Sequence, residues 1–213
     1  MGNLKDLTVT DFVQITSSDE PAPGGGSISA LAGTLAAALA EMVARLTVGR
    51  AKYAESEEDM QKVLAEASAI KEELLEAIQK DSSSFNQYMD ALSMPKNTDE
   101  EKAARLAAMQ EGLKAAARVP LSVAQASVKV LPLAKLAVTK GNPNAVTDGL
   151  VATMCARTAV LGALFNVKIN LSSIKDQAFV EEMAAEVAKL EKEAIQGEQD
   201  VLSCTDISRE LYA

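Results

Sequence analysis

Apolar residues recur at helical spacing along most of the chain, and turn signals divide the chain into about six helices before a last amphipathic one. A Thr8–Asp11 pair predicts the cap of a short first helix that ends near Thr16. The strongest loop in the sequence follows at 21–27, and Ser27 is a suitable N-cap for a long second helix that reaches about Gly49. Small residues lie on several faces of this second helix, so we expect it at the centre of a bundle.

The later helices are separated by prolines, capping residues and one Gly-Asn-Pro turn. Thr98 and Glu101 form a capping box, Pro120 is expected to end one helix, and Pro132 is expected to kink the next. Asn142 followed by Pro143 predicts a helix start, because proline is favourable in the first turn. The remaining helices are therefore predicted over 56–91, 98–119, 120–139, 142–165 and 176–208, with a short irregular segment at 166–170.

Composition supports an all-α fold. Only 3% of the residues are aromatic, tryptophan is absent, and alanine, leucine, glutamate and lysine dominate. A chain of 213 residues is long enough for one large core, so we expect a single-domain bundle of long helices over residues 1–213.

The formal charge of −9 argues against nucleic acid or an anionic membrane surface as a partner. Cys155 and Cys204 are too few for a disulfide framework, and the sequence shows no signal peptide. The apolar run at 28–40 is short for a membrane span and is interpreted as a core helix. We therefore expect a cytoplasmic protein with reduced thiols.

The chain contains no histidine. This excludes histidine general bases, triads that contain histidine, and most zinc sites. Acid–base chemistry must then come from Asp, Glu, Lys, Tyr or Cys side chains, or from backbone groups.

The Gly24–Ser27 loop is the first candidate site. Three glycines allow a ligand to approach the backbone closely, and the free N–H groups of a helix start attract anions. A flexible entry to a buried helix explains the same residues equally well. No Gly-Lys-Ser/Thr sequence follows, so the loop is not a P-loop.

Two aspartates are further candidates. Asp81 lies between the apolar residues Ile78 and Phe85, where burial can raise the pKa of a carboxyl group, although a solvated aspartate is the more frequent interpretation of such a position. Asp148 lies in an apolar stretch with no other charge before Arg157, which suggests a partner or a cavity. It can equally be an acid that interacts favourably with a helix start.

Arg45, Arg50 and Lys52 cluster at the end of the second helix. Contact with an anionic ligand is one interpretation, but cations near a helix C-terminus also interact favourably with the helix dipole, and this interpretation is favoured.

Taken together, several stretches resemble one known family. They are PAPGGGS at 21–27, GRAKY at 49–53, DSSSF at 81–85, the long segment 95–121, NAVTD at 144–148 and FNVKIN at 165–170. The chain resembles the formimidoyltetrahydrofolate cyclodeaminase domain, which also occurs as the C-terminal half of the bifunctional formimidoyltransferase-cyclodeaminase, and the resemblance covers nearly the whole chain.

The resemblance implies an all-helical homodimer with a helical interface near the folate site, and neither a metal nor a redox cofactor. It places Asp81 at the family's proposed catalytic position. It also implies that a set of motif residues lines the substrate site: Pro23, Gly24, Gly25, Gly26, Ser27, Lys52, Asp148, Asn166 and Asn170.

The implied reaction converts 5-formimidoyltetrahydrofolate to 5,10-methenyltetrahydrofolate with release of ammonia. A single carboxylate can accept the N10 proton and then protonate the leaving nitrogen. The related alternative is methenyltetrahydrofolate cyclohydrolase, in which water attacks the same carbon. A helical folate-binding or scaffold module without activity is an alternative from a different class.

Overall fold

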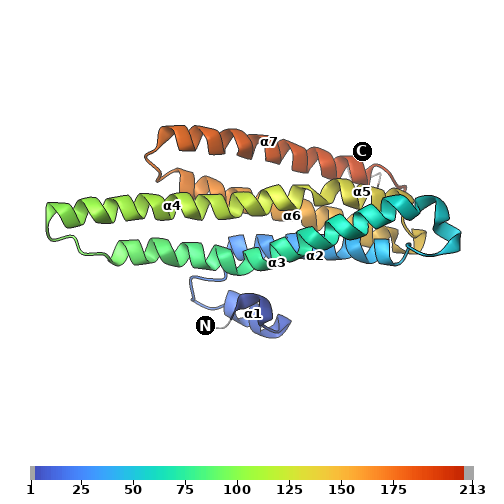
Figure 1. Ribbon diagram of the computed structural model, residues 1–213, viewed down its shortest axis with the longest axis horizontal. Coiled ribbons are helices and arrows are strands. Elements are labelled where there is room, and N and C mark those ends of the chain that lie inside the picture. Colours follow the sequence, from blue (N-terminus) through green and yellow to red (C-terminus); the bar gives the residue numbers. More distant parts are fainter. Residues whose placement is uncertain (1–2, 209–213) are drawn as a thin grey trace.

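The computed structural model describes residues 3–208, apart from the side chain of Phe85, and forms an elongated bundle of helices (Figure 1). No strand occurs between residues 3 and 208, which confirms the predicted all-α fold. The elements are η1 (Leu4–Asp6), α1 (Val9–Thr16), α2 (Gly25–Arg45), η2 (Ala51–Ser56), α3 (Glu57–Ser93), α4 (Asp99–Val128), α5 (Val130–Lys140), η3 (Pro143–Ala145), α6 (Val146–Leu171) and α7 (Gln177–Leu202).

The long helices lie side by side along the length of the molecule. α2 packs against α3 and α6, and α4 packs against α3 and α6, so these four helices enclose the core. α5 continues beyond the end of α4, α7 covers α5 and α6 on one side, and α1 lies apart on the opposite side (Figure 1). The Phe12 side chain of α1 is 8% exposed and belongs to the core, although the rest of that helix is mostly exposed.

The small residues of α2 allow its neighbours to approach closely, as the sequence predicts. Ala30, Ala36, Ala37, Ala40 and Ala44 are fully buried. A Cβ atom on Gly33 would lie 2.5 Å from the Ser127 hydroxyl oxygen and 2.9 Å from a methyl carbon of Leu74. α2 therefore lies at the centre of the bundle, where glycine and alanine set the distance to α3 and α4.

The start of α2 differs from the prediction. Gly24 is the N-cap and adopts an extended backbone, so the helix begins at Gly25, and the Ser27 side chain points into the bundle instead of capping the helix. The helix also ends at Arg45, before a turn in which Gly49 has φ 71°. The start of α3 agrees with the prediction, since the helix begins at Glu57, although the Ser56 side chain makes no capping hydrogen bond.

The two prolines act differently from the prediction. The Thr98–Glu101 capping box is present, but α4 continues through Pro120 to Val128. The helix breaks at Lys129, one turn before Pro132. A proline ring clashes with the carbonyl four residues earlier, which is that of Val128, so Pro132 marks where α5 begins.

The segment 166–170 was expected to be irregular and is helical instead. α6 continues to Leu171, because the asparagine side chains in its last turns bond to backbone carbonyls of the same helix. α7 begins after the Asp176 cap and ends at Leu202, six residues before the predicted end at Ser208.

Within residues 3–208, three helical segments are long and apolar enough to cross a membrane by length and composition, α2 among them. The expectation that 28–40 is too short for a span is therefore wrong, because α2 extends beyond that run to 21 residues. Half or more of the most apolar window of each segment is buried inside the bundle. Their apolar surface therefore serves helix packing in this fold, and the cytoplasmic location stays a prediction.

We predict that Gly33→Ala destabilises the protein by about 1–3 kcal/mol, because the added methyl group overlaps Ser127 and Leu74. In a Ser127→Ala background the cost should be smaller, since removal of the hydroxyl makes room and eliminates a buried group without a hydrogen-bond partner. Urea unfolding of the two single variants and the double variant measures this coupling. If the destabilisations of the two single variants simply add in the double variant, the close packing of α2 against α4 does not depend on the contact between Gly33 and Ser127.

Candidate functional site

A pocket of about 200 Å³ lies where the start of α2 meets the middle of α3 and α4 and the end of α6. Ligand pockets usually measure about 300–1,000 Å³, so this one accommodates one end of a larger molecule. Its lining residues come from segments far apart in the sequence: Pro21, Ala22, Gly24, Gly25, Gly26, Asp81, Ser82, Ser84, Ala116, Asn166 and Asn170.

The glycine loop forms one wall of this pocket because it must approach Asp81 closely. A Cβ atom on Gly26 would lie 2.1 Å from a carboxyl oxygen of Asp81, so only glycine fits this contact. The backbone N–H groups of the first turn of α2 have no partner within the helix. The start of α2 therefore directs hydrogen-bond donors and the positive end of its dipole towards the carboxyl group.

Asp81 is only partly exposed, and Ile78, one turn earlier on α3, is fully buried. Burial raises the pKa of the Asp81 carboxyl above its ordinary value, and hydrogen bonds from the Ser27 hydroxyl and backbone N–H oppose part of this shift. Within residues 3–208, Asp81 forms no ion pair. The side chain of Phe85, the other expected apolar neighbour, lies outside the described part.

The Ser27 hydroxyl is fully buried and has two acceptors within reach. Its oxygen lies 3.0 Å from Oδ2 of Asp81 and 3.1 Å from the carbonyl oxygen of Ile78. A hydroxyl carries one proton, so it can donate to the ionised carboxylate, or donate to Ile78 while it accepts from the protonated carboxyl. Ser27 therefore supports both protonation states of Asp81.

Two asparagines of α6 form the opposite wall. Asn166 faces the glycine loop, since a Cβ atom on Gly25 would lie 3.3 Å from its amide nitrogen. Asn170 lies one turn further and donates to the backbone carbonyl of Ala116 in α4 at 3.1 Å. The end of α6 thus brings amide groups to the pocket from the side facing the glycine loop.

Two of the sequence-predicted residues lie elsewhere in this protomer. Asp148 is in the first turn of α6, 18 residues before Asn166, which corresponds to about 27 Å along the helix axis. Lys52 lies in η2, beyond the other end of α2, with its ammonium group 5.3 Å from the centre of the Tyr53 ring. Both are therefore remote from the pocket of their own chain.

Two more predicted residues contribute without lining the pocket. Pro23 is buried within the loop, and Ser27 lies behind Asp81. Conversely, the sequence analysis did not identify five of the residues that line the pocket: Pro21, Ala22, Ser82, Ser84 and Ala116. The serines belong to the DSSSF stretch and could have been inferred from it, whereas Ala116 was hidden because Pro120 was interpreted as a helix end.

The pocket thus combines one carboxyl group with a raised pKa, backbone donors from a helix start and side-chain amides. Such a combination suits the binding of a small polar molecule.

Comparison with known proteins agrees with this description. Residues 8–189 match the family model described as formiminotransferase-cyclodeaminase. The methenyltetrahydrofolate cyclohydrolase of Methylorubrum extorquens is 40% identical over 187 residues, which are 88% of this chain and 90% of that protein. The formimidoyltransferase-cyclodeaminase of Mus musculus is 34% identical over 192 residues, but the match spans only 36% of that protein.

A solved structure shares the fold. The crystal structure of formiminotetrahydrofolate cyclodeaminase from Thermotoga maritima superimposes with a TM-score of 0.82 at 28% identity, over 93% of this chain and 95% of that one. The chain therefore belongs to the formiminotransferase-cyclodeaminase family, which confirms the resemblance found in the sequence.

We predict that Ser27→Ala raises the pKa of Asp81 further, because it removes a hydrogen bond that favours the ionised form. A ¹³C NMR titration of the Asp81 carboxyl carbon measures this directly. Ser29→Ala is the matched control, since the Ser29 hydroxyl bonds only to the Gly25 carbonyl of its own helix, and it should leave the pKa unchanged.

The same shift has a consequence for stability. A carboxyl group with a raised pKa in the folded state stabilises the fold below its unfolded pKa, and this contribution is lost as pH rises through the folded pKa. Ser27→Ala should therefore steepen the loss of stability towards neutral pH. An unchanged or lowered pKa of Asp81 in this variant would disprove the role given to Ser27.

Proposed function

We propose that this protein is an enzyme of folate one-carbon metabolism that converts 5-formimidoyltetrahydrofolate to 5,10-methenyltetrahydrofolate and releases ammonia. One observation carries the proposal: Asp81, a largely buried carboxyl group with a raised pKa, faces the glycine-rich helix start in a chain of this family. A carboxyl group whose pKa is shifted towards neutrality suits both acceptance and donation of a proton.

The reaction needs two proton transfers, and Asp81 can perform both in turn. As N10 attacks the carbon of the protonated formimidoyl group (–CH=NH2+), the carboxylate accepts the N10 proton, and a neutral tetrahedral carbon that carries an NH2 group forms. The protonated carboxyl then donates this proton to the NH2 nitrogen, the bond from carbon to that nitrogen breaks with its electron pair staying on nitrogen, and ammonia leaves as the methenyl cation forms. Ser27 stabilises Asp81 before and after each transfer, because its hydroxyl can donate to the carboxylate or accept from the acid.

Charge favours the same direction of reaction. The methenyl product is a cationic amidinium, and a nearby carboxylate stabilises positive charge that develops on the folate. The mechanism requires proton transfer and positioning only, so it uses neither a metal nor a redox cofactor.

Methenyltetrahydrofolate cyclohydrolase is the second candidate function. The specific observation in its favour is the 40% identity to a cyclohydrolase that matches nine-tenths of its own length. Asp81 would accept a proton from the water that attacks the methenyl carbon, and then protonate N5 as its bond to that carbon breaks, while the remaining hydroxyl proton passes to solvent as the carbonyl forms. The product would be 10-formyltetrahydrofolate.

Incubation of the purified protein with each folate distinguishes these functions. If the formimidoyl substrate gives an increase in the absorbance of the methenyl product and an equal amount of ammonia, the protein is a cyclodeaminase. Loss of methenyl absorbance without ammonia, well above the spontaneous rate, supports the cyclohydrolase. Folate binding without turnover of either substrate would identify an inactive binding module.

We predict that Asp81→Asn lowers turnover by roughly 10²–10⁴-fold, the usual contribution of general acid–base catalysis. Folate affinity should change little, because the side chains are nearly isosteric. The melting temperature at pH 7 should equal or exceed that of the wild type, since the variant no longer carries the cost of ionising a buried carboxyl group.

Asp148→Asn is the comparison variant, because Asp148 also belongs to the predicted site but lies at the other end of α6. It should retain proton transfer and affect substrate binding at most. If Asp81→Asn has normal turnover, and Asp148→Asn binds folate but is inactive, then Asp148 is the proton-transfer residue and Asp81 is not.

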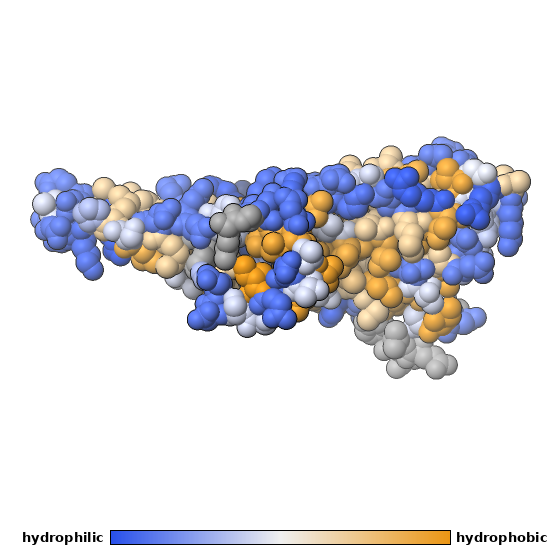
Figure 2. Space-filling model, turned by 90° about the horizontal axis from the view of Figure 1, so that it is seen from below, coloured by the Kyte–Doolittle hydropathy of each residue, from blue (hydrophilic) through white to orange (hydrophobic). Residues whose placement is uncertain are grey.

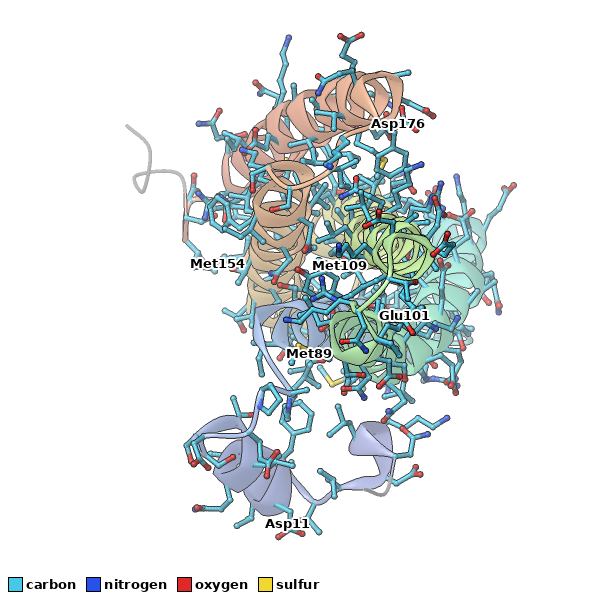
Figure 3. The ribbon with its side chains drawn as sticks, turned by 90° about the vertical axis from the view of Figure 1, so that its left-hand side faces the viewer. Asp11, Met89, Glu101, Met109, Met154 and Asp176 are labelled. Carbon is cyan, nitrogen blue, oxygen red and sulfur yellow. The ribbon has the colours of Figure 1, made fainter. Side chains whose placement is uncertain are left out.

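We further propose that the protein is a homodimer whose copies meet through α2 and α6. The two helices are antiparallel neighbours, since Gly25 lies against Asn166 and Ser29 against Gly162. Large apolar side chains are exposed along both helices: Ile28, Leu35 and Met42 on α2, and Val151, Met154, Phe165 and Ile169 on α6. Figure 2 shows apolar residues on the face seen from below, and Figure 3 shows Met154 on the outward side of α6. Exposed apolar side chains along two neighbouring helices are typical of an interface.

A two-fold axis perpendicular to α6 would also explain the remote residues. The exposed stripe of α6 runs from Val151 to Ile169, and antiparallel pairing about its midpoint places the partner's residue 150 beside Asn170. The partner's Asp148 would then lie at the edge of the pocket, where substrate binding by this residue becomes possible.

We predict a dimer by light scattering at micromolar concentration. Phe165→Glu, which places a charge in the proposed interface where the side chain is 62% exposed, should produce monomers. Ile195→Glu on α7, where the side chain is 43% exposed and away from α2, should leave the dimer intact. A monomeric wild type, or dissociation by Ile195→Glu alone, would refute this interface.

A further inference from the structure

We propose that Pro120 is a positioning residue of the pocket: it releases the backbone carbonyl of Ala116, which fixes the Asn170 amide so that its oxygen accepts an N–H donor of the ligand. This inference rests on the proposed function, because the ligand is taken to be a folate. It concerns the end of the pocket formed by α4 and α6.

The first step concerns the backbone of α4. In a continuous helix the carbonyl of residue 116 accepts the N–H of residue 120, but proline has no N–H. α4 nevertheless continues through Pro120, and the carbonyl of Ala116 accepts the Asn170 amide nitrogen at 3.1 Å instead. The side chain of α6 therefore occupies the place of the missing donor.

The second step concerns the orientation of the amide. The Asn170 nitrogen donates to the Ala116 carbonyl and, at 2.8 Å, to the Asn166 carbonyl, so both of its N–H groups are used. The reverse orientation would place the amide oxygen against two carbonyl oxygens, which repel it. The hydrogen-bond network therefore fixes which atom is nitrogen, and the amide oxygen is left as the acceptor.

The third step concerns the pocket. Asn166 is held in the same way, with its nitrogen bonded to the Gly162 carbonyl at 2.9 Å. Both asparagines line the pocket, so their amide oxygens add two neutral acceptors to the Asp81 carboxylate. Such a wall suits a ligand edge that carries adjacent N–H donors. In a folate, the 2-amino group and N3–H of the pterin form such an edge.

An alternative view is that the fold merely tolerates a proline at position 120, without a role in the pocket. Proline is the least favourable residue in a helix interior, and alanine would restore the ordinary hydrogen bond to Ala116. The two views predict different ligand affinities for Pro120→Ala. If Pro120 positions Asn170, the variant keeps or gains stability and loses ligand affinity, since the new N–H competes with Asn170 for the Ala116 carbonyl.

The experiment measures two independent properties of Pro120→Ala. Calorimetry with 5-formyltetrahydrofolate, a stable folate that lacks the leaving nitrogen, should show about tenfold weaker binding, the usual effect of one lost hydrogen bond. The ¹⁵N side-chain amide signals of Asn170, measured without ligand, should shift and exchange faster with solvent. The melting temperature should not fall.

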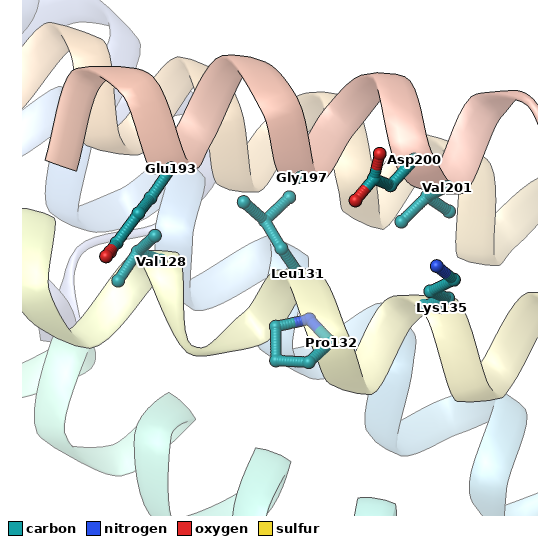
Figure 4. A pocket seen from close by; sticks show the side chains of 8 residues that line it. All are labelled: Val128, Leu131, Pro132, Lys135, Glu193, Gly197, Asp200 and Val201. Atoms are coloured by element: carbon teal, nitrogen blue, oxygen red, sulfur yellow. The ribbon is translucent and has the colours of Figure 1, made fainter. Parts of the chain in front are cut away.

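Pro132→Ala is the matched control, because Pro132 also lies in a helix but lines a separate groove between α5 and α7 (Figure 4). It should change neither the affinity nor the Asn170 signals. Asn170→Ala should weaken binding at least as much as Pro120→Ala, and the double variant should be no weaker than Asn170→Ala alone.

The outcomes separate this inference from the proposed function. If the wild type binds no folate, the proposed function fails. If the wild type binds and Pro120→Ala retains both its affinity and its Asn170 signals, the positioning role is refuted. An affinity loss that persists unchanged in the Asn170→Ala background also refutes it, because Pro120 would then act through another group.

Discussion

The contact between the start of α2 and Asp81 of α3 is the constraint on which the site depends. A Cβ atom on Gly26 would overlap the carboxyl group, so the two helices can meet here only because α2 begins with glycine. Their approach reduces the exposure of Asp81 to water and places the Ser27 hydroxyl against it. Burial by itself would disfavour the ionised form, whereas the donors of Ser27 and the helix start favour it. The balance of these effects makes a carboxyl group useful for proton transfer in a chain without histidine.

The wall of the pocket formed by α4 and α6 depends on a residue that is unfavourable in a helix, Pro120. Pro120 interrupts the hydrogen bonding of α4, yet the helix continues because Asn170 supplies a donor to the Ala116 carbonyl. The same bond ties the end of α6 to α4 and orients an amide at the pocket. Proton transfer and ligand orientation are thus assigned to different helices, and both rely on close backbone approaches set by small residues.

Asp148 and Lys52 belong to the predicted substrate site but do not reach the pocket of their own chain. They lie at the end of the bundle away from the pocket, while the face formed by α2 and α6 exposes large apolar side chains. In the proposed homodimer, antiparallel pairing of two such faces would cover the apolar surface and bring the second end of one copy to the pocket of the other.

Local patterns determined the helical class, the central place of α2 and the Thr98–Glu101 cap, because helical spacing and capping act over a few residues. Asp81 and the glycine loop were favoured as site residues by the family resemblance, since local patterns left a solvated aspartate and a flexible loop as alternatives. Tertiary contacts decided the rest. Pro120 was interpreted as a helix end, since nothing local shows that a side chain 50 residues later replaces its missing N–H. Segment 166–170 was interpreted as irregular, but it is helical: its asparagines bond to carbonyls of α6, and the Asn170 amide also bonds to Ala116 of α4. Ser27 was predicted to cap α2, but packing turned it towards Asp81. Propensity is a weak local preference, and hydrogen bonds between distant segments override it when they satisfy groups that are buried in the bundle.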